Sequence, residues 1–329
     1  MRVRLGAYLA TILCCVAPLA ASGQAYPSRQ ITMIVPFPAG SGPDVYARLI
    51  GAKLAPRLGQ SVVIENRAGA GGAIGGRALA RAEPDGYTIM FGSTSSVLVA
   101  PAIAKDTPYD PVKAFAPVIQ VARGPFILSV RSELPIHNVQ EFVAYAKANP
   151  GKLNYGTSGI GSLHHLSTEL LKHVAKIEMT HIPYPGGAQS WTALQSGFVE
   201  LIFDSMPGPI SSLQVGKARA IAVTGTKRLG SLAAAPMMGS VPTFAEQGLP
   251  GVDVIFWFGI VAPAGTPADI VARLNADLAA SIDDDAVKQR LAQEGIDGVA
   301  GPAADFAKVI ADGAVQWQNV VTELGLKQR

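Results

Sequence analysis

The chain has 329 residues, of which 49% are hydrophobic and 16% are charged, and its formal net charge is +3 at pH 7. This composition excludes a disordered chain and provides enough apolar residues for one large domain or two of ordinary size. The charges are nearly balanced and form no basic stripe, so we expect no nucleic-acid partner.

The first 25 residues have the pattern of a secretory signal peptide. Arg2 and Arg4 precede an apolar stretch over 5–19, and small residues follow up to Ala25. The apolar stretch is about five residues shorter than a membrane-spanning helix needs, which favours cleavage over a membrane anchor. We expect cleavage near Ala25 and a mature chain that lies in the periplasm and is not embedded in the membrane.

Cysteine chemistry is confined to the same segment. Cys14 and Cys15 are the two cysteines of the chain, and cleavage would remove both. The mature chain would then hold no disulfide, no Cys–zinc site and no thiol nucleophile.

Strand-like and helical patterns alternate along the first part of the mature chain. Pro43 and Asp44 suit the first turn of a helix, and Gly59 is placed to end it. In chain order the pattern predicts a strand over 31–35, a helix from 43 to 59, a strand over 61–65, a helix over 72–82 and a strand over 87–91. This order is typical of a doubly wound sheet.

The same alternation restarts in the middle of the chain. It predicts strands over 153–155, 179–184, 201–203 and 218–223, with helices over 162–173 and 188–196. The tail is predicted to be mostly helical, over 268–282, 285–294 and 303–324.

Strand-like segments near 118–130 and 252–262 join these two units. If the chain crosses between lobes at both places, the C-terminal helices return to the first lobe. We therefore expect an α/β, two-lobed periplasmic binding protein fold with a mostly parallel sheet in each lobe and a ligand cleft between the lobes. Residues 26–125 and 253–329 would form lobe 1, and 126–252 would form lobe 2.

A glycine-rich motif and a histidine-containing motif could indicate a nucleotide site and a metal site. The glycines over 69–76 follow a strand, but Ile74 stands where a dinucleotide-binding loop requires glycine. His165, Glu169 and His173 recur on one helix face, yet the two histidines lie about 12 Å apart by helix rise and cannot share an ion. We therefore expect no nucleotide cofactor and no metal.

A serine hydrolase is the alternative from another class of protein. Ser158 and Ser162 are near His164 and His165 in the sequence, and Asp204 lies further along. No Gly-x-Ser-x-Gly motif is present. The alternative is thus an exported enzyme that would use Ser158 or Ser162 with His165, whereas we expect no catalysis.

Two glycine-rich turns from a strand into a helix, over 37–44 and 156–162, point instead to binding. Each offers free backbone N–H groups at the positive end of a helix dipole, which favours an anion. Neither turn contains Lys or Arg. A carboxylate held between them would have its charge compensated by backbone N–H groups, hydroxyls and helix dipoles.

Many short motifs, in order, resemble the Bug-type solute receptors of tripartite tricarboxylate transporters. They are YPSRQI at 26–31, VPF at 35–37, VIENR at 63–67, GAGG at 69–72, PDGYT at 84–88, AKANPGKL at 146–153, HIPY at 181–184, PTFAE at 242–246, GLPG at 248–251, WFG at 257–259 and APAGTP at 262–267. The resemblance spans over 200 residues of the chain. It implies a receptor, not an enzyme, that encloses a carboxylate between two lobes.

The resemblance also implies which residues touch the ligand. It places in the cleft the first-lobe and second-lobe turns, the loop after the third strand and the end of a second-lobe strand: Phe37, Pro38, Ala39, Gly40, Asp44, Ser93, Thr94, Thr157, Ser158, Gly159, Ser162 and Asp204. Three positions depart from the family pattern. Pro43 removes a hydroxyl and an N–H donor, Ala193 replaces a common Asp, and Trp191 is bulkier than usual.

The expected function is therefore capture of a small organic carboxylate and its delivery to the membrane permease subunits of a tripartite transporter. A membrane sensor is the alternative partner. We expect the receptor to be a monomer.

Overall fold

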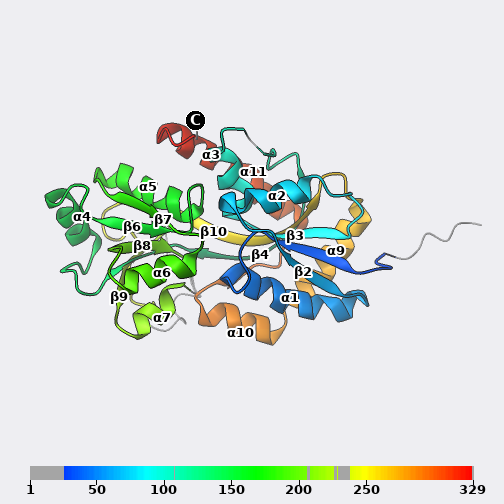
Figure 1. Cartoon of the computed structure of the whole chain (residues 1–329). Coiled ribbons are helices and arrows are strands. Elements are labelled where there is room, and N and C mark those ends of the chain that lie inside the picture. Colours follow the sequence, from blue (N-terminus) through cyan, green and yellow to red (C-terminus); the bar gives the residue numbers. More distant parts are fainter. Residues whose placement is uncertain (1–25, 107, 206–207, 226–227, 229–237, 328–329) are drawn as a thin grey trace, which may run out of the picture.

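The computed structural model describes residues 26–106, 108–205, 208–225, 228 and 238–327. The expected signal peptide, with both cysteines, lies outside the described residues. Two sheets with helices on their faces form two lobes side by side (Figure 1). The expected α/β, two-lobed architecture is confirmed.

The sheet of lobe 1 has the strand order β11-β4-β10-β3-β1-β2. Its strands are β1 (Ile31–Val35), β2 (Val62–Asn66), β3 (Thr88–Ser93), β4 (Phe115–Pro125), β10 (Ile255–Pro263) and β11 (Asp297–Gly298). β1 pairs in parallel with β2 and β3, whereas β10 is antiparallel to both of its neighbours, β3 and β4. β4 therefore runs in the same direction as the first three strands.

The sheet of lobe 2 has the order β7-β6-β8-β5-β9. Its strands are β5 (Ile127–Arg131), β6 (Asn154–Thr157), β7 (Thr180–Pro183), β8 (Leu201–Asp204) and β9 (Ala218–Val223). β5 is antiparallel to β8 and β9, and β6 is parallel to β7 and β8. In each sheet most strands run in one direction. They are opposed in lobe 1 by β10, which belongs to a crossing, and by the short edge strand β11, and in lobe 2 by β5 of the other crossing.

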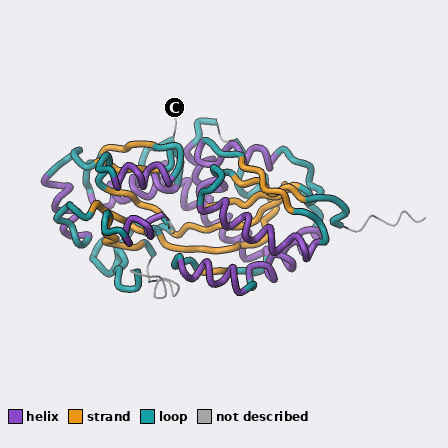
Figure 2. Tube along the Cα trace, turned by 60° about the horizontal axis from the view of Figure 1, so that its bottom comes forward, coloured by secondary structure: helices purple, strands orange, loops and turns teal. Residues whose placement is uncertain are grey.

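Helices cover both faces of each sheet (Figures 1 and 2). In lobe 1, α1 (Gly42–Leu58), α9 (Ala268–Ile282) and α10 (Asp285–Gln293) lie on one face, and α2 (Ala73–Ala80), α3 (Ala100–Ile103) and α11 (Ala303–Glu323) on the other. In lobe 2 the helices are α4 (Val139–Ala148), α5 (Leu163–Ala175), α6 (Gly187–Gln195) and α7 (Gly208–Gln214). The C-terminal helices pack on lobe 1, so the predicted return crossing is present.

Two neighbouring strands make the crossings between the lobes. β4 leads directly through Phe126 into β5, and β10 pairs with β4 along its whole length on the way back. Buried Thr224 ties the two crossings together, because its hydroxyl accepts from the Phe126 N–H at 2.7 Å and donates to the Val254 carbonyl. We propose lobe boundaries beside these residues, with 26–125 and 253–329 in lobe 1 and 126–252 in lobe 2.

The helices that face the cleft begin and end at identifiable signals. α1 starts with Pro43 in its first turn and ends at Gly59, which has the positive φ of 65° that glycine adopts easily. α5 starts at Ser162, whose hydroxyl accepts a hydrogen bond from the His165 N–H at 3.2 Å. The N-termini of both helices lie at the same cavity, which residues 40–43 and 162–164 line.

None of the described helices is long and apolar enough to cross a membrane.

Candidate functional site

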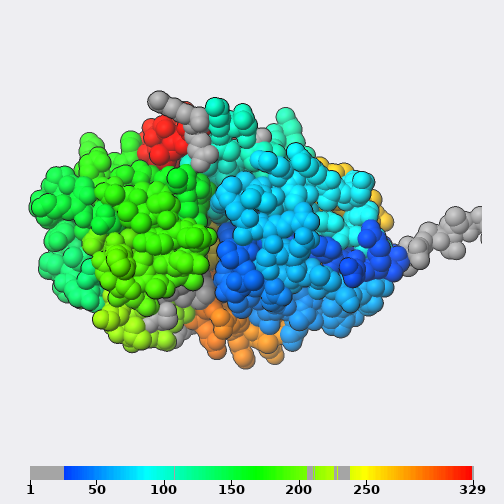
Figure 3. Space-filling view, viewed as in Figure 1, coloured from blue at the N-terminus to red at the C-terminus, as the bar shows by residue number. Residues whose placement is uncertain are grey.

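A cleft with a cavity volume of about 960 Å³ lies between the lobes. Lobe 1 lines it with residues 36–43, 68–72 and 93–95, and lobe 2 with 158–160, 162–164, 184–189, 191–192, 195 and 204–205. Phe126, Phe256 and Phe258 from the crossing strands also line it. Figure 3 shows the two lobes meeting along a seam on one face of the molecule.

Ten of the twelve residues that the sequence places at the site line this cleft. They are Phe37, Pro38, Ala39, Gly40, Ser93, Thr94, Ser158, Gly159, Ser162 and Asp204. Asp44 and Thr157 are buried and do not line it. Contact of any of these residues with a ligand stays a prediction.

Asp44 shapes the first-lobe turn from inside the lobe. Its carboxylate accepts from the Gly40 N–H at 2.8 Å, from Arg48 Nε at 3.0 Å and from Asn66 Nδ2 at 2.8 Å. Burial would raise the pKa of Asp44, but these donors hold it below its ordinary value. Asp44 thus remains ionised and fixes the turn. Its hydrogen-bond partners all belong to lobe 1, and its side chain lies behind the cleft surface.

Thr157, which the sequence places at the ligand site, lies behind the surface of the cleft. Its hydroxyl lies 2.7 Å from His181 Nε2, and it accepts from the Gly159 N–H at 3.2 Å. Burial, together with the neighbouring His165, lowers the pKa of His181 to about 4, so that ring is neutral. As the last residue of β6, Thr157 points its side chain into the lobe, where it holds the turn instead of lining the cleft.

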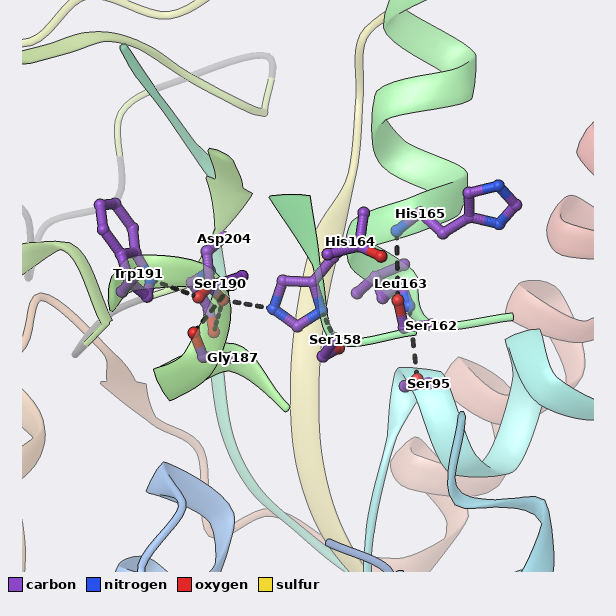
Figure 4. A network of polar contacts seen from close by, with 12 residues as sticks. Ser95, Ser158, Ser162, Leu163, His164, His165, Gly187, Ser190, Trp191 and Asp204 are labelled. Carbon is purple, nitrogen blue, oxygen red and sulfur yellow. Dashed lines mark hydrogen bonds and ion pairs between the residues drawn. The ribbon is translucent and has the colours of Figure 1, made fainter. Parts of the chain in front are cut away.

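A chain of polar contacts crosses the lobe 2 wall of the cleft (Figure 4). Ser158 Oγ lies 2.7 Å from His164 Nδ1, and His164 Nε2 lies 2.5 Å from Asp204 Oδ1. Of the two adjacent histidines, it is therefore His164 that meets the serine and the carboxylate. His165 turns away from the cleft and stacks on His181 with ring centroids 4.4 Å apart, which corrects its expected role in the serine hydrolase alternative.

Both carboxylate oxygens of Asp204 have hydrogen-bond partners. Oδ2 accepts from Trp191 Nε1 at 2.8 Å, and Oδ1 accepts from the Ser205 N–H at 2.6 Å as well as contacting His164. Burial would raise the pKa of Asp204, but the His164 ring and these N–H donors hold it below its ordinary value. The bulky Trp191, noted as a departure from the family pattern, thus has a defined partner in this chain.

The lobes also touch beside the N-terminus of α5. Ser95, in the π-helical turn after β3, accepts from the Leu163 N–H at 3.3 Å and donates to the Gly71 carbonyl at 3.1 Å. Gly71 and Gly161 approach closely here, since a Cβ at Gly71 would lie 2.7 Å from the Gly161 carbonyl oxygen. The glycines over 69–72, interpreted from the sequence as a tight turn, are part of the contact between the lobes.

The charge of the cleft is set by few groups. Among the described residues that line it there is no Lys or Arg, and the ionisable groups are His164, Asp204 and Tyr184. No cluster of three potential metal ligands occurs in the part of the chain that the structure describes. The wall instead carries hydroxyls and the N-termini of α1 and α5, whose dipoles favour a small anion, while the Gly40, Gly159 and Leu163 N–H groups there are bonded within the protein.

Comparisons with known proteins agree with this geometry. The family model "Tripartite tricarboxylate transporter family receptor" matches residues 46–326. Protein BugT of Bordetella pertussis is 34% identical over 93% of this chain and 92% of its own length. R. palustris Rpa4515, solved with adipate, is 37% identical with a TM-score of 0.83, covering 91% of this chain and 98% of its own.

A second solved structure, MatC from Rhodopseudomonas palustris with bound malate, is 33% identical and has a TM-score of 0.82. The match covers 90% of this chain and 100% of that one. The match thus extends over the lobes, the crossings and the cleft alike. The chain belongs to the receptor family of the tripartite tricarboxylate transporters.

Proposed function

We propose that the protein captures a small organic carboxylate in the cleft between its lobes and delivers it to the membrane permease of a tripartite transporter. The observation that carries this proposal is the cleft itself, which has helix N-termini from both lobes and neutral donors along its walls. The relatives solved with adipate and malate support a carboxylate as the ligand class.

The cleft suits a carboxylate without an arginine or lysine partner. A buried anion needs compensation, because an unpaired charge in a closed cleft is prohibitively costly. The turns before α1 and α5 supply the positive ends of helices of 17 and 13 residues. The hydroxyl of Ser158 lies on the same wall, and the aromatic rings of the crossing strands exclude water from the apolar part of the ligand.

Isothermal titration calorimetry tests the ligand class. The protein, unfolded and refolded to remove carried-over ligand, is titrated with adipate, malate, citrate, glutamate and benzoate, and with butylamine as a cationic control. We expect at least one carboxylate to bind with one-to-one stoichiometry and butylamine to give no heat. Absence of binding by every carboxylate in the panel would contradict the proposal.

We infer further that the protein is a receptor and not a hydrolase, although Ser158, His164 and Asp204 lie in contact. In serine hydrolases the N–H that follows the nucleophile stabilises the oxyanion. Here the Gly159 N–H is already bonded to Thr157 Oγ1. We expect no labelling of Ser158 by a fluorophosphonate, measured by intact mass; stoichiometric labelling would favour the enzyme.

We propose that the receptor acts in the periplasm as a monomer, after cleavage near Ala25. The family description, a transporter receptor, supports a permease over a sensor as the partner. The mass of the protein recovered from the periplasm tests the cleavage position, and light scattering tests the monomer. Loss of carboxylate uptake on deletion of the receptor gene, restored by plasmid expression, would support the permease; unchanged uptake would favour the sensor.

A further inference from the structure

His164 is the one side chain among the described residues of the cleft wall that can gain a positive charge. Its side chain is 17% exposed, and the ring lies between Ser158 on one nitrogen and Asp204 on the other. The Phe126 ring packs against it with centroids 5.3 Å apart. The imidazole is therefore held in place and retains access to the cleft.

Asp204 determines which nitrogen of the imidazole carries the proton in the neutral form. An ionised carboxylate only accepts hydrogen bonds, so the Nε2 atom that contacts it must carry a hydrogen. Trp191 and Ser205 donate to the same carboxylate and keep it ionised. In the neutral ring, Nδ1 is then an acceptor, and the Ser158 hydroxyl must donate to it.

The direction of that hydrogen bond decides what Ser158 offers to a ligand. While His164 is neutral, the hydroxyl hydrogen points at Nδ1 and the cleft faces lone pairs, which repel a carboxylate. When His164 is protonated, Nδ1–H donates to Ser158 Oγ, and the hydroxyl hydrogen is free to donate into the cleft. Protonation also places a positive charge beside the ligand, where no other described cleft residue supplies one.

We infer that Ser158, His164 and Asp204 form a proton-coupled carboxylate site, in which capture of the ligand is accompanied by uptake of a proton at His164. This inference rests on the proposed function, because it concerns the carboxylate bound in the same cleft. By reciprocity, the ligand favours the protonated imidazole as much as the proton favours the ligand. Affinity therefore rises as the pH falls, by up to about tenfold per pH unit.

Among the described titratable groups near the ligand site, we assign the proton uptake to His164. The imidazole contacts ionised Asp204, which ends β8. Tyr184, in the loop after β7, also lines the cleft. On its own helix, His165 stacks on His181 outside the cleft. Glu169, also on α5, is bonded to Tyr155 and Lys172.

Calorimetry with adipate in buffers of different ionisation enthalpy tests the inference. At several pH values, titrations in two buffers of unlike ionisation enthalpy, such as phosphate and imidazole, give the number of protons bound per adipate. Malate replaces adipate as the probe if the panel above shows tighter binding. We expect uptake that peaks near one proton and affinity that falls as the pH rises.

Three variants test whether His164 is the group that takes up the proton. His164→Gln keeps an amide able to reach Asp204 but cannot be protonated, so proton uptake and the pH dependence should disappear. Ser158→Ala removes the hydroxyl that reverses direction and should weaken adipate binding, most strongly at the acidic end of the range. His137→Gln, at an exposed histidine outside the cleft, is the matched control and should retain the uptake.

The outcomes separate this inference from the proposed function. Binding of adipate or malate with no proton uptake, or with uptake that persists in His164→Gln, would overturn the inference and leave the receptor function intact. If His164→Gln does not fold, pH-independent affinity of the wild type, which by linkage means that no proton is taken up, would overturn it. No binding of any carboxylate in the panel would overturn both.

Discussion

The hydroxyl of Ser95 in lobe 1 accepts a hydrogen bond from the backbone N–H of Leu163 in lobe 2, with 3.3 Å between Oγ and N. The donor is the first residue of α5, whose leading N–H groups have no partner within the helix. The same hydroxyl donates to Gly71, so Ser95 connects a loop of one lobe to a helix of the other. This contact is available only when the lobes are close together.

Ser95→Ala is expected to weaken carboxylate binding without a comparable loss of ligand-free stability. The contact belongs to the closed arrangement, and a hydrogen bond of this kind contributes about 1 kcal/mol. Calorimetry should therefore show an affinity lower by roughly fivefold. Thr322→Ala, which removes an exposed hydroxyl bonded within α11, is the control. Equal affinities for Ser95→Ala and wild type would show that this contact does not contribute to closure.

Gly71→Ala is expected to keep the lobes apart. The new Cβ would lie 2.7 Å from the Gly161 carbonyl oxygen, and φ at this position is 64°. Gly59→Ala is a matched control, since its φ is 65° but a Cβ there meets nothing within 4 Å. Both changes should cost about 1–2 kcal/mol of unfolding free energy from backbone strain, measured in urea. Only Gly71→Ala should also lower ligand affinity, and a similar loss in Gly59→Ala would remove the steric explanation.

Thr157 and Ser158 are adjacent but should affect different measurements. Thr157→Val removes the hydroxyl that contacts His181 Nε2 and the Gly159 N–H. Because these buried groups lose their partner, we expect the unfolding free energy to fall by about 1–3 kcal/mol. Ser158→Ala changes a hydroxyl on the cleft wall and should weaken binding with little change in stability. Urea unfolding and calorimetry on both variants separate the effects. A stable Thr157→Val variant that loses binding would show that Thr157 contributes directly to ligand binding.

Acid should destabilise the ligand-free protein through the stacked histidines. Burial lowers the pKa of both His165 and His181, the latter to about 4. Between an unfolded-state pKa near 6.5 and the folded value of about 4, the unfolded chain binds more protons, so stability falls as the pH drops through this range. Unfolding in urea at several pH values measures the slope.

The variant His181→Gln should flatten that slope, because its amide can contact Thr157 but does not titrate. His137→Gln, at an exposed position, should leave the slope as in the wild type. A slope that is equally steep in His181→Gln would assign the acid sensitivity to other groups.

The helix ends were predictable because their signals are local. Gly59 ends α1 and Ser162 begins α5, and each effect depends on the backbone of a few neighbouring residues. The tail helix α9 spans the predicted residues, and the strand β9 does as well. By contrast, α4 was not predicted, although Asn138 caps it by accepting from the Glu141 N–H at 2.8 Å. The Asn138 cap is the local signal in the sequence that indicates this helix.

The site was predictable at the level of turns but not of single side chains. His164 and His165 are neighbours on a helix, so their side chains point about 100° apart, and the sequence alone gives no reason to choose which one meets the cleft. Thr157 ends a strand, where one step along the chain reverses the side-chain direction. The contact between Ser95 and Leu163 depends on how the lobes lie in space, which no local pattern encodes.

The pairing of β4 with β10 limits how the receptor can open. Two separate linkers would allow the lobes to swing and to twist independently, but here the crossings leave the lobe 1 sheet as the hydrogen-bonded ends of β4 and β10, a short two-stranded ribbon, and Thr224 joins them where they enter lobe 2. Such a ribbon bends readily out of its own plane and resists bending within it, because in-plane bending would stretch the bonds between the strands. We therefore expect the lobes to separate mainly by a hinge motion perpendicular to the ribbon.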